Sequence, residues 1–269
     1  MNMIKIIHRK LFSLLFFTLF IGFVDGQSLP GSYFSPWSVG LLDIHHINTG
    51  KGESVFIIMP DGTTMLVDAG ATTRPKPRVT DQKPDASRTP GEWISRYILH
   101  MMKDIPSKKL DYILLTHFDG DHIGDYSDKA KTSSSGTFKL TGITEVGEHV
   151  PFKKLVDRGW PNYNFPIALS NDKMRNYKQF LKWHIEKNQS IIEDFKVGQN
   201  SQFVLVYARE EYPDFEIRNI ACNGYVWTGV GTNVRNHFPK LSDLKISEYP
   251  GENMCSIAFR LSYGKFDYF

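Results

Sequence analysis

The chain has 269 residues, of which 41% are hydrophobic, 13% aromatic and 23% charged. This is the composition of an ordinary globular protein, and it excludes a disordered chain, a coiled coil and a collagen-like fibre. The formal net charge is only +3, from 32 basic and 29 acidic residues, which excludes a uniformly basic nucleic-acid coat. Two cysteines are too few for a disulfide scaffold or a cysteine-based zinc site.

The N-terminal segment has the pattern of a secretory signal. Basic residues, among them Lys5 and Lys10, precede the 14-residue apolar run Leu11 to Val24, and Gly26 follows. As a helix that run rises about 21 Å, which is short of the roughly 30 Å hydrocarbon core of a bilayer. The pattern therefore predicts a signal peptide over residues 1–26 rather than a membrane anchor. We expect a secreted or periplasmic protein without stable membrane association after cleavage.

The mature chain, residues 27–269, is predicted to form one α/β domain. Short apolar or alternating runs predict strands at 39–47, 55–59, 64–67, 111–116, 203–207, 215–221, 225–227 and 255–263. One helix should begin at Pro90, with Thr89 as N-cap and Glu92 completing a capping box, and should end before Pro106. A second amphipathic helix is predicted over 172–187, and the Ser- and Lys-rich residues 127–137 are expected to form a surface loop.

Four potential metal ligands, His117, Asp119, Asp121 and His122, directly follow the predicted strand 111–116. Alternate side chains of extended backbone point the same way, so His117 and Asp119 can share one ion. A turn at Gly120 then brings Asp121 and His122 toward a second ion. An ordinary polar turn is the simpler alternative. A metal site is favoured because burying so much charge without a counter-ion is costly.

The motif His-x-Asp-x-Asp-His after an apolar strand resembles the metallo-β-lactamase superfamily signature His-x-His-x-Asp-His, with Asp119 in place of the second histidine. It is similar to the variant in ComEC-type DNA-uptake proteins and their secreted relatives. Segments that also match, within about residues 38–269, are the turn from Gly50 to Glu53, the strand end Asp68-Ala69-Gly70, and Asn253 with Ser256. The resemblance implies an αββα sandwich.

The resemblance also implies a role for each site residue. His117 and Asp119 would hold one divalent metal ion, and Asp121 and His122 a second. Asp68 would orient the ligands or the nucleophilic water without touching the metal, although a turn-capping aspartate is the simpler interpretation. Catalysis would then depend on Asp121 and Asp68. The carboxylate at Asp119 makes Mn²⁺ more competitive with Zn²⁺, so either ion remains open.

By resemblance, the function is hydrolysis by metal-activated water, with phosphodiester bonds as the favoured substrate class and nucleic acid or a small molecule as the substrate. Two alternatives stay open: hydrolysis of C–N or C–O bonds, as in lactamases and lactonases, and a non-catalytic exported binding domain with a degenerate metal site. In the family, the strand 255–263 leads into Gly-Asp, which bridges both metals, and later into another ligand histidine. Because Phe269 precedes both, we expect a C-terminally truncated portion of a longer hydrolase, with an incomplete second half and weak metal binding.

Several other residues have two interpretations. Cys222 and Cys255 lie in apolar runs, and export permits a disulfide between them, but two buried thiols fit equally well. His149 is the best additional ligand candidate, although a surface or core histidine is the simpler interpretation. The basic loop 74–88 follows Asp68 closely enough to contact a phosphate, and a solvated loop is the alternative.

Overall fold

The computed structural model describes residues 34–50, 52–72 and 80–269, and residues 37–269 pack as one compact unit. The predicted signal peptide and residues 74–79 of the basic loop lie outside the described residues. Within the described part of the chain, no helix is long and apolar enough to cross a membrane.

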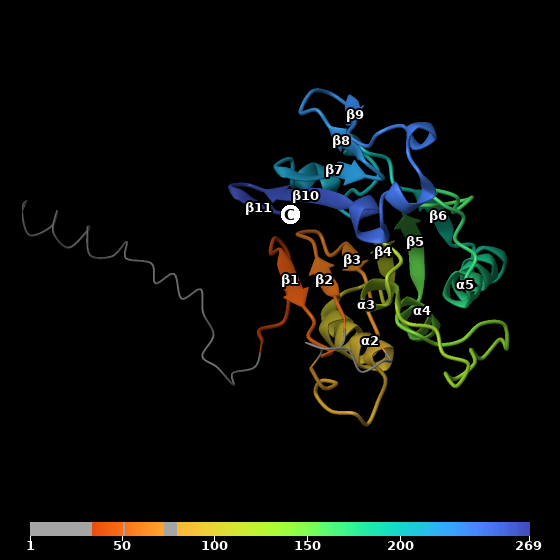
Figure 1. Ribbon diagram of the computed structural model, residues 1–269. Coiled ribbons are helices and arrows are strands. Elements are labelled where there is room, and N and C mark those ends of the chain that lie inside the picture. The colour runs from red at the N-terminus through yellow and green to blue at the C-terminus, as the bar shows by residue number, and fades with distance from the viewer. Residues whose placement is uncertain (1–33, 51, 73–79) are drawn as a thin grey trace, which may run out of the picture. The chain divides into compact units, whose positions relative to one another are not determined.

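The first sheet contains six strands in chain order (Figure 1). Its strands are β1 (Asp43–His46), β2 (Val55–Ile58), β3 (Thr64–Val67), β4 (Leu110–Leu114), β5 (Phe152–Asp157) and β6 (Ile191–Asp194). The pairs β1–β2 and β2–β3 are antiparallel, while β3, β4, β5 and β6 run parallel. Because parallel strands point the same way, the carboxyl ends of β3, β4 and β5 meet at one edge of the sheet, where α/β proteins bind ligands.

The second sheet is antiparallel, with the order β11-β10-β7-β8-β9. Its strands are β7 (Phe215–Cys222), β8 (Tyr225–Trp227), β9 (Val234–Asn236), β10 (Ala258–Tyr263) and β11 (Phe266–Tyr268). Short 3₁₀ helices lie along the chain: η2 (Met102–Asp104), η3 (Arg209–Glu211), η4 (Leu241–Asp243), η5 (Ile246–Glu248) and η6 (Glu252–Cys255).

Two hydrophobic cores lie on opposite faces of the first sheet. The helices α2 (Pro90–Met101), α4 (Ile143–His149) and α5 (Asp172–Asn188) pack on one face, where the core includes Phe56, Ile94 and Phe180. The second sheet packs on the other face, where Ile57 and Leu261 are fully buried. Alternate residues of β2 enter different cores, which is why this strand reads as a continuous apolar run. The predicted α/β class is therefore confirmed, as three layers: helices, first sheet and second sheet.

The start of α2 agrees with the prediction except in one detail. Thr89 is extended at φ −71°, its hydroxyl accepts from the Glu92 amide at 3.3 Å, and Pro90 opens the helix. The second half of the predicted capping box is wrong. The Glu92 carboxylate instead contacts Arg88 and Arg96, whose charges compete successfully for it.

Other element predictions also need correction. The strand predicted at 203–207 is a loop, because side chains occupy its amides: Tyr112 binds the Val204 N–H and Asp61 binds the Tyr207 N–H. The strand predicted at 39–47 shortens to β1, and the residues before β10 form η6. The strands β5 and β6 and the helix α4 were not predicted, since each is short and has no strong periodicity. The loop predicted at 127–137 is confirmed.

One buried histidine in the helical layer makes the stability of the protein depend on pH. His184 on α5 is 1% exposed among aromatic rings, with the Phe180 and Phe152 centroids 4.4 and 4.5 Å away. Its Nδ1 lies 3.0 Å from the Asn188 amide nitrogen. Burial lowers the pKa of His184 from 6.5 to about 4, while Glu148 acts in the opposite direction. Between these values the unfolded chain binds the proton more readily, so His184 makes the protein less stable as pH falls.

We therefore expect the variant His184→Leu to lose less stability than the parent between pH 7 and pH 4.5. The difference should be about 2 to 3 kcal/mol, the free energy of the pKa difference over that interval. Urea unfolding at the two pH values measures it. The matched control is His149→Gln at an exposed histidine, which should keep the parental pH dependence. Equal pH dependence in His184→Leu and the parent would contradict the assignment.

Candidate metal centre

Three chain segments, which contain Glu53, Gly70 and Asp121, are joined by backbone hydrogen bonds at the carboxyl edge of the first sheet. The loop that carries the predicted ligands, residues 116–124, is called the ligand loop below. The Glu53 amide donates to the Asp121 carbonyl at 2.8 Å, and the Gly70 amide donates to the Glu53 carbonyl at 2.9 Å. A Cβ on Gly70 would lie 1.8 Å from the Asp121 carbonyl oxygen, so the backbones approach this closely only because residue 70 is glycine.

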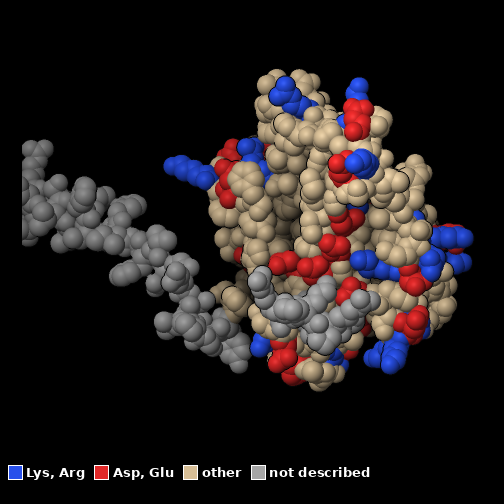
Figure 2. All heavy atoms as spheres, viewed as in Figure 1, with Lys and Arg blue, Asp and Glu red and all other residues tan. Residues whose placement is uncertain are grey.

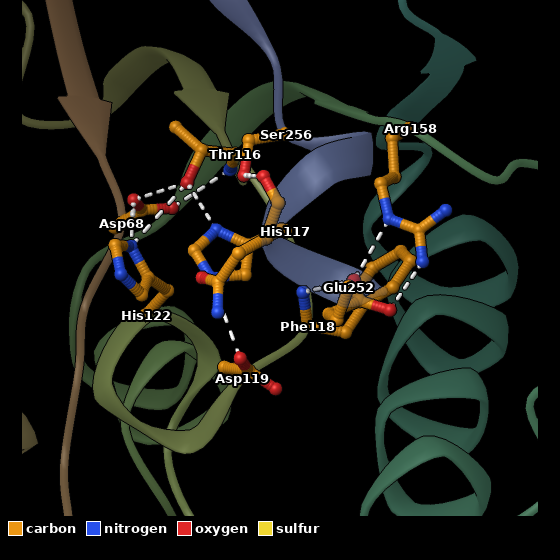
Figure 3. Close-up of polar contacts among 10 residues, drawn as sticks. Asp68, Thr116, His117, Phe118, Asp119, His122, Arg158, Glu252 and Ser256 are labelled. Atoms are coloured by element: carbon orange, nitrogen blue, oxygen red, sulfur yellow. Dashed lines mark hydrogen bonds and ion pairs between the residues drawn. The ribbon is translucent and has the colours of Figure 1, made fainter. Parts of the chain in front are cut away.

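The Asp68 carboxylate connects β3 to the ligand loop. Its Oδ1 accepts the Thr116 amide at 2.8 Å, and its Oδ2 accepts the Thr116 hydroxyl at 2.6 Å (Figure 3). Oδ2 also lies 2.7 Å from Nδ1 of His122. Asp68 is 3% exposed and has a left-handed backbone, with φ 57°, which aspartate tolerates better than most residues. Asp68 therefore supports the ligand loop directly, and its interactions go beyond those of a turn cap.

These hydrogen bonds define which histidine nitrogens can accept a metal. The Thr116 hydroxyl donates its one hydrogen to Asp68, so at 3.2 Å it accepts from Nδ1 of His117. Nδ1 of His122 likewise donates to Asp68. In the neutral form of both rings, Nε2 is then the nitrogen with a free lone pair. A carboxylate or hydroxyl that fixes the far nitrogen of a histidine is the usual support of a metal-ligating imidazole.

The strongest single indication of a metal site is found at His117. It is 3% exposed, and its Nε2 has no hydrogen-bond partner among the described residues. Asp119 Oδ2 lies 3.8 Å away, too far for a hydrogen bond. A buried acceptor without a donor is costly, and a cation between Nε2 and Oδ2 would satisfy both atoms. The donor set, one imidazole and one carboxylate, fits a divalent cation.

The two histidines affect each other. Their ring centroids are 3.9 Å apart. Burial and the neighbouring His122 lower the pKa of His117, against the carboxylates of Asp68, Asp119 and Glu252. Burial also opposes the charging of His122, but the Asp68 hydrogen bond and the nearby charges outweigh it and raise the pKa of His122. The neutral form that binds metal is thus favoured at His117.

The second predicted ligand pair is more exposed than the first. Asp121 is exposed in the short helix α3 (Gly120–Ile123), and its negative charge raises the pKa of His122. Within the described part of the chain, no group of three or more His, Cys, Asp or Glu side chains is arranged to hold one ion. The structure therefore brings together His117, Asp119, His122 and Asp68, and places Asp121 at the exposed rim of the same loop.

The described surface near the site carries a group of acidic side chains. In the space-filling view, Asp and Glu side chains gather near the middle of the face, beside a hollow and over the region where Figure 1 draws α3 (Figure 2). Such a concentration of negative charge attracts cations.

The other candidate residues lie outside this cluster or are inert. Cys222 and Cys255 are free, buried thiols, and burial raises the pKa of both. His149 is exposed at the end of α4. Two contributors to the site, Thr116 and Glu252, were not predicted from the sequence. Each is adjacent to a motif that was singled out, since Glu252 precedes Asn253 and Thr116 precedes His117.

No model of a known protein family matches this chain, and no curated protein matches it.

The close approach at Gly70 leads to a stability prediction. Gly70→Ala should lower the free energy of unfolding by about 2 to 3 kcal/mol, because the added methyl group pushes the ligand loop away from β3. Urea unfolding measures the effect. Gly251→Ala is the control, since a Cβ there meets nothing within 4 Å. Equal stability of the two variants would show that the segments are not packed as described.

Proposed function

We propose that this chain is an exported, metal-dependent hydrolase of the metallo-β-lactamase superfamily that cleaves phosphodiester bonds. The single observation that carries the proposal is the buried Nε2 of His117, which lacks a hydrogen-bond partner among the described residues and lies 3.8 Å from Asp119 Oδ2. The order of layers, helices against a mixed sheet against an antiparallel sheet, is compatible with three layers of an αββα sandwich.

In this proposal the residues of the chain have distinct roles. His117 and Asp119 would hold one divalent cation, Zn²⁺ or Mn²⁺, and Asp121 and His122 would hold another. Bound divalent cations supply positive charge that stabilises a developing oxyanion, and they make water more acidic. Asp68 keeps His122 in one orientation and one tautomer through its 2.7 Å hydrogen bond. Thr116 does the same for His117.

A non-catalytic exported binding domain with a degenerate metal site is the second candidate. It is favoured by the arrangement of the described residues, in which no three ligand-type side chains converge on one ion position. The two candidates differ in turnover, which only the hydrolase predicts.

Metal dependence can be tested on the full-length protein after dialysis against a chelator. We expect hydrolysis of bis(4-nitrophenyl) phosphate to disappear on dialysis and to return with Zn²⁺ or Mn²⁺. A chromogenic lactam and a lactone test the C–N and C–O alternatives in parallel. Metal binding without turnover of any substrate would favour the binding domain, and an absence of metal binding would exclude the hydrolase.

The variant Asp121→Asn should abolish turnover in the same assay and leave the fold intact. It replaces the proposed carboxylate ligand by an amide of the same size at an exposed position, so the packing is unchanged. Far-ultraviolet circular dichroism checks the fold. The control is Asp243→Asn, an exposed aspartate in η4, which should retain full activity. Parental activity in Asp121→Asn would rule out a role for this carboxylate.

A further inference from the structure

A buried arginine lies next to the ligand loop. Arg158 follows β5 directly and is 2% exposed. Its Nε donates to Glu252 Oε1 at 2.8 Å, and its Nη2 donates to Glu252 Oε2. Its Nη1 donates to the Phe165 carbonyl at 3.2 Å and to Asn223 Oδ1 at 3.1 Å. Two parallel N–H···O bonds to one carboxylate fix the orientation of a guanidinium more firmly than a single hydrogen bond does.

The same carboxylate binds the backbone of the ligand loop. Glu252 Oε1 accepts the Phe118 amide at 2.8 Å, as Figure 3 shows. Phe118 lies between His117 and Asp119, so rotation of this peptide would move both side chains. The Arg158 guanidinium also lies 4.8 Å from the centroid of the Phe118 ring. The backbone and side chain of Phe118 are thus both held by one ion pair.

The ion pair connects the two sheets across the site. Arg158 comes from the carboxyl edge of the first sheet, and Glu252 from η6, which leads into β10 of the second sheet. Close by, the Ile257 amide donates to the Thr116 carbonyl at 3.0 Å. The position of the ligand loop therefore depends on contacts from both sheets.

We infer that Glu252, held by Arg158, is a positioning residue that keeps His117 and Asp119 in metal-binding geometry through the Phe118 amide. The expected effect on metal binding rests on the proposed function. The expected effect on the position of the ligand loop does not depend on it. If the ion pair is purely structural, removing it would change only the stability of the protein. If it positions the ligand loop, removing it would also change the affinity for metal and the opening of the loop.

The test uses Glu252→Gln in the full-length protein, because glutamine keeps the size and one oxygen but loses the charge that Arg158 requires. We expect the affinity for Zn²⁺ or Mn²⁺, measured by calorimetric titration, to fall 10–100-fold, the usual effect of changing a residue that supports metal ligands. Arg158→Lys, which keeps the charge and loses the two-pronged contact, should give a similar loss. It replaces Glu252→Gln as the test if that variant does not fold.

The matched control is Glu216→Gln on β7. Glu216 also pairs with arginine, in its case with Arg218 and Arg260. It lies near the start of β7, whereas the end of β7 leads to Asn223, which contacts Arg158. This variant should bind metal within twofold of the parent. Unchanged affinity in Glu252→Gln, or an equal loss in Glu216→Gln, would overturn the positioning role.

Hydrogen exchange of the metal-free protein separates this inference from the proposed function. Peptides that cover the ligand loop should exchange at least tenfold faster in Glu252→Gln than in the parent or in Glu216→Gln. If the parent binds no metal but this acceleration is seen, the proposed function fails and the positioning of the loop stands. If exchange of the loop is unchanged, the positioning role fails, whatever the metal affinity of the parent.

Discussion

The carboxylate of Asp68 accepts hydrogen bonds from the backbone and hydroxyl of Thr116 and from the ring of His122, and the candidate site depends on these three contacts. They join the end of β3 to the loop after β4 at the edge where the parallel strands finish. Asp68 makes them from a left-handed backbone with φ 57°, a conformation that costs an ordinary residue about 1 to 2 kcal/mol. Three hydrogen bonds to a buried acceptor offset that cost. The strain is thus located where it orients a candidate ligand.

Local patterns predicted the elements whose stability is local. The strand predicted at 111–116 is β4 because a run of buried apolar residues suits a central parallel strand. Thr89 caps α2 because its hydroxyl meets an amide three residues away. Residues 203–207 have the same apolar character, yet they form a loop whose amides bind side chains such as Tyr112 and Asp61. Those partners are distant in sequence, so no local pattern could reveal that the strand would not form.

The same distinction applies to the site. The ligand loop could be found from the sequence because four ligand-type residues lie close together. The apolar strand that precedes it predicted that the loop lies at an edge of the sheet. The interaction between Arg158 and Glu252 spans 94 positions and leaves no trace in local spacing. The only indication in the sequence was that Glu252 directly precedes Asn253, which resembles a residue of the family motif. Charged residues that support a site are harder to find than its ligands, because any surface position can hold an arginine or a glutamate.

Electrostatics link the proposed metal to the proposed substrate. The face around the ligand loop carries a concentration of acidic side chains (Figure 2), and Asp68, Asp119 and Asp121 add their own charges at the site. A phosphodiester is an anion, so these carboxylates oppose its approach unless cations compensate for them. The same carboxylates draw divalent cations to the loop and favour their retention. In the proposed function, bound cations would therefore serve the binding of a phosphodiester as well as the chemical step, whereas a neutral lactam or lactone would need them for the chemical step alone.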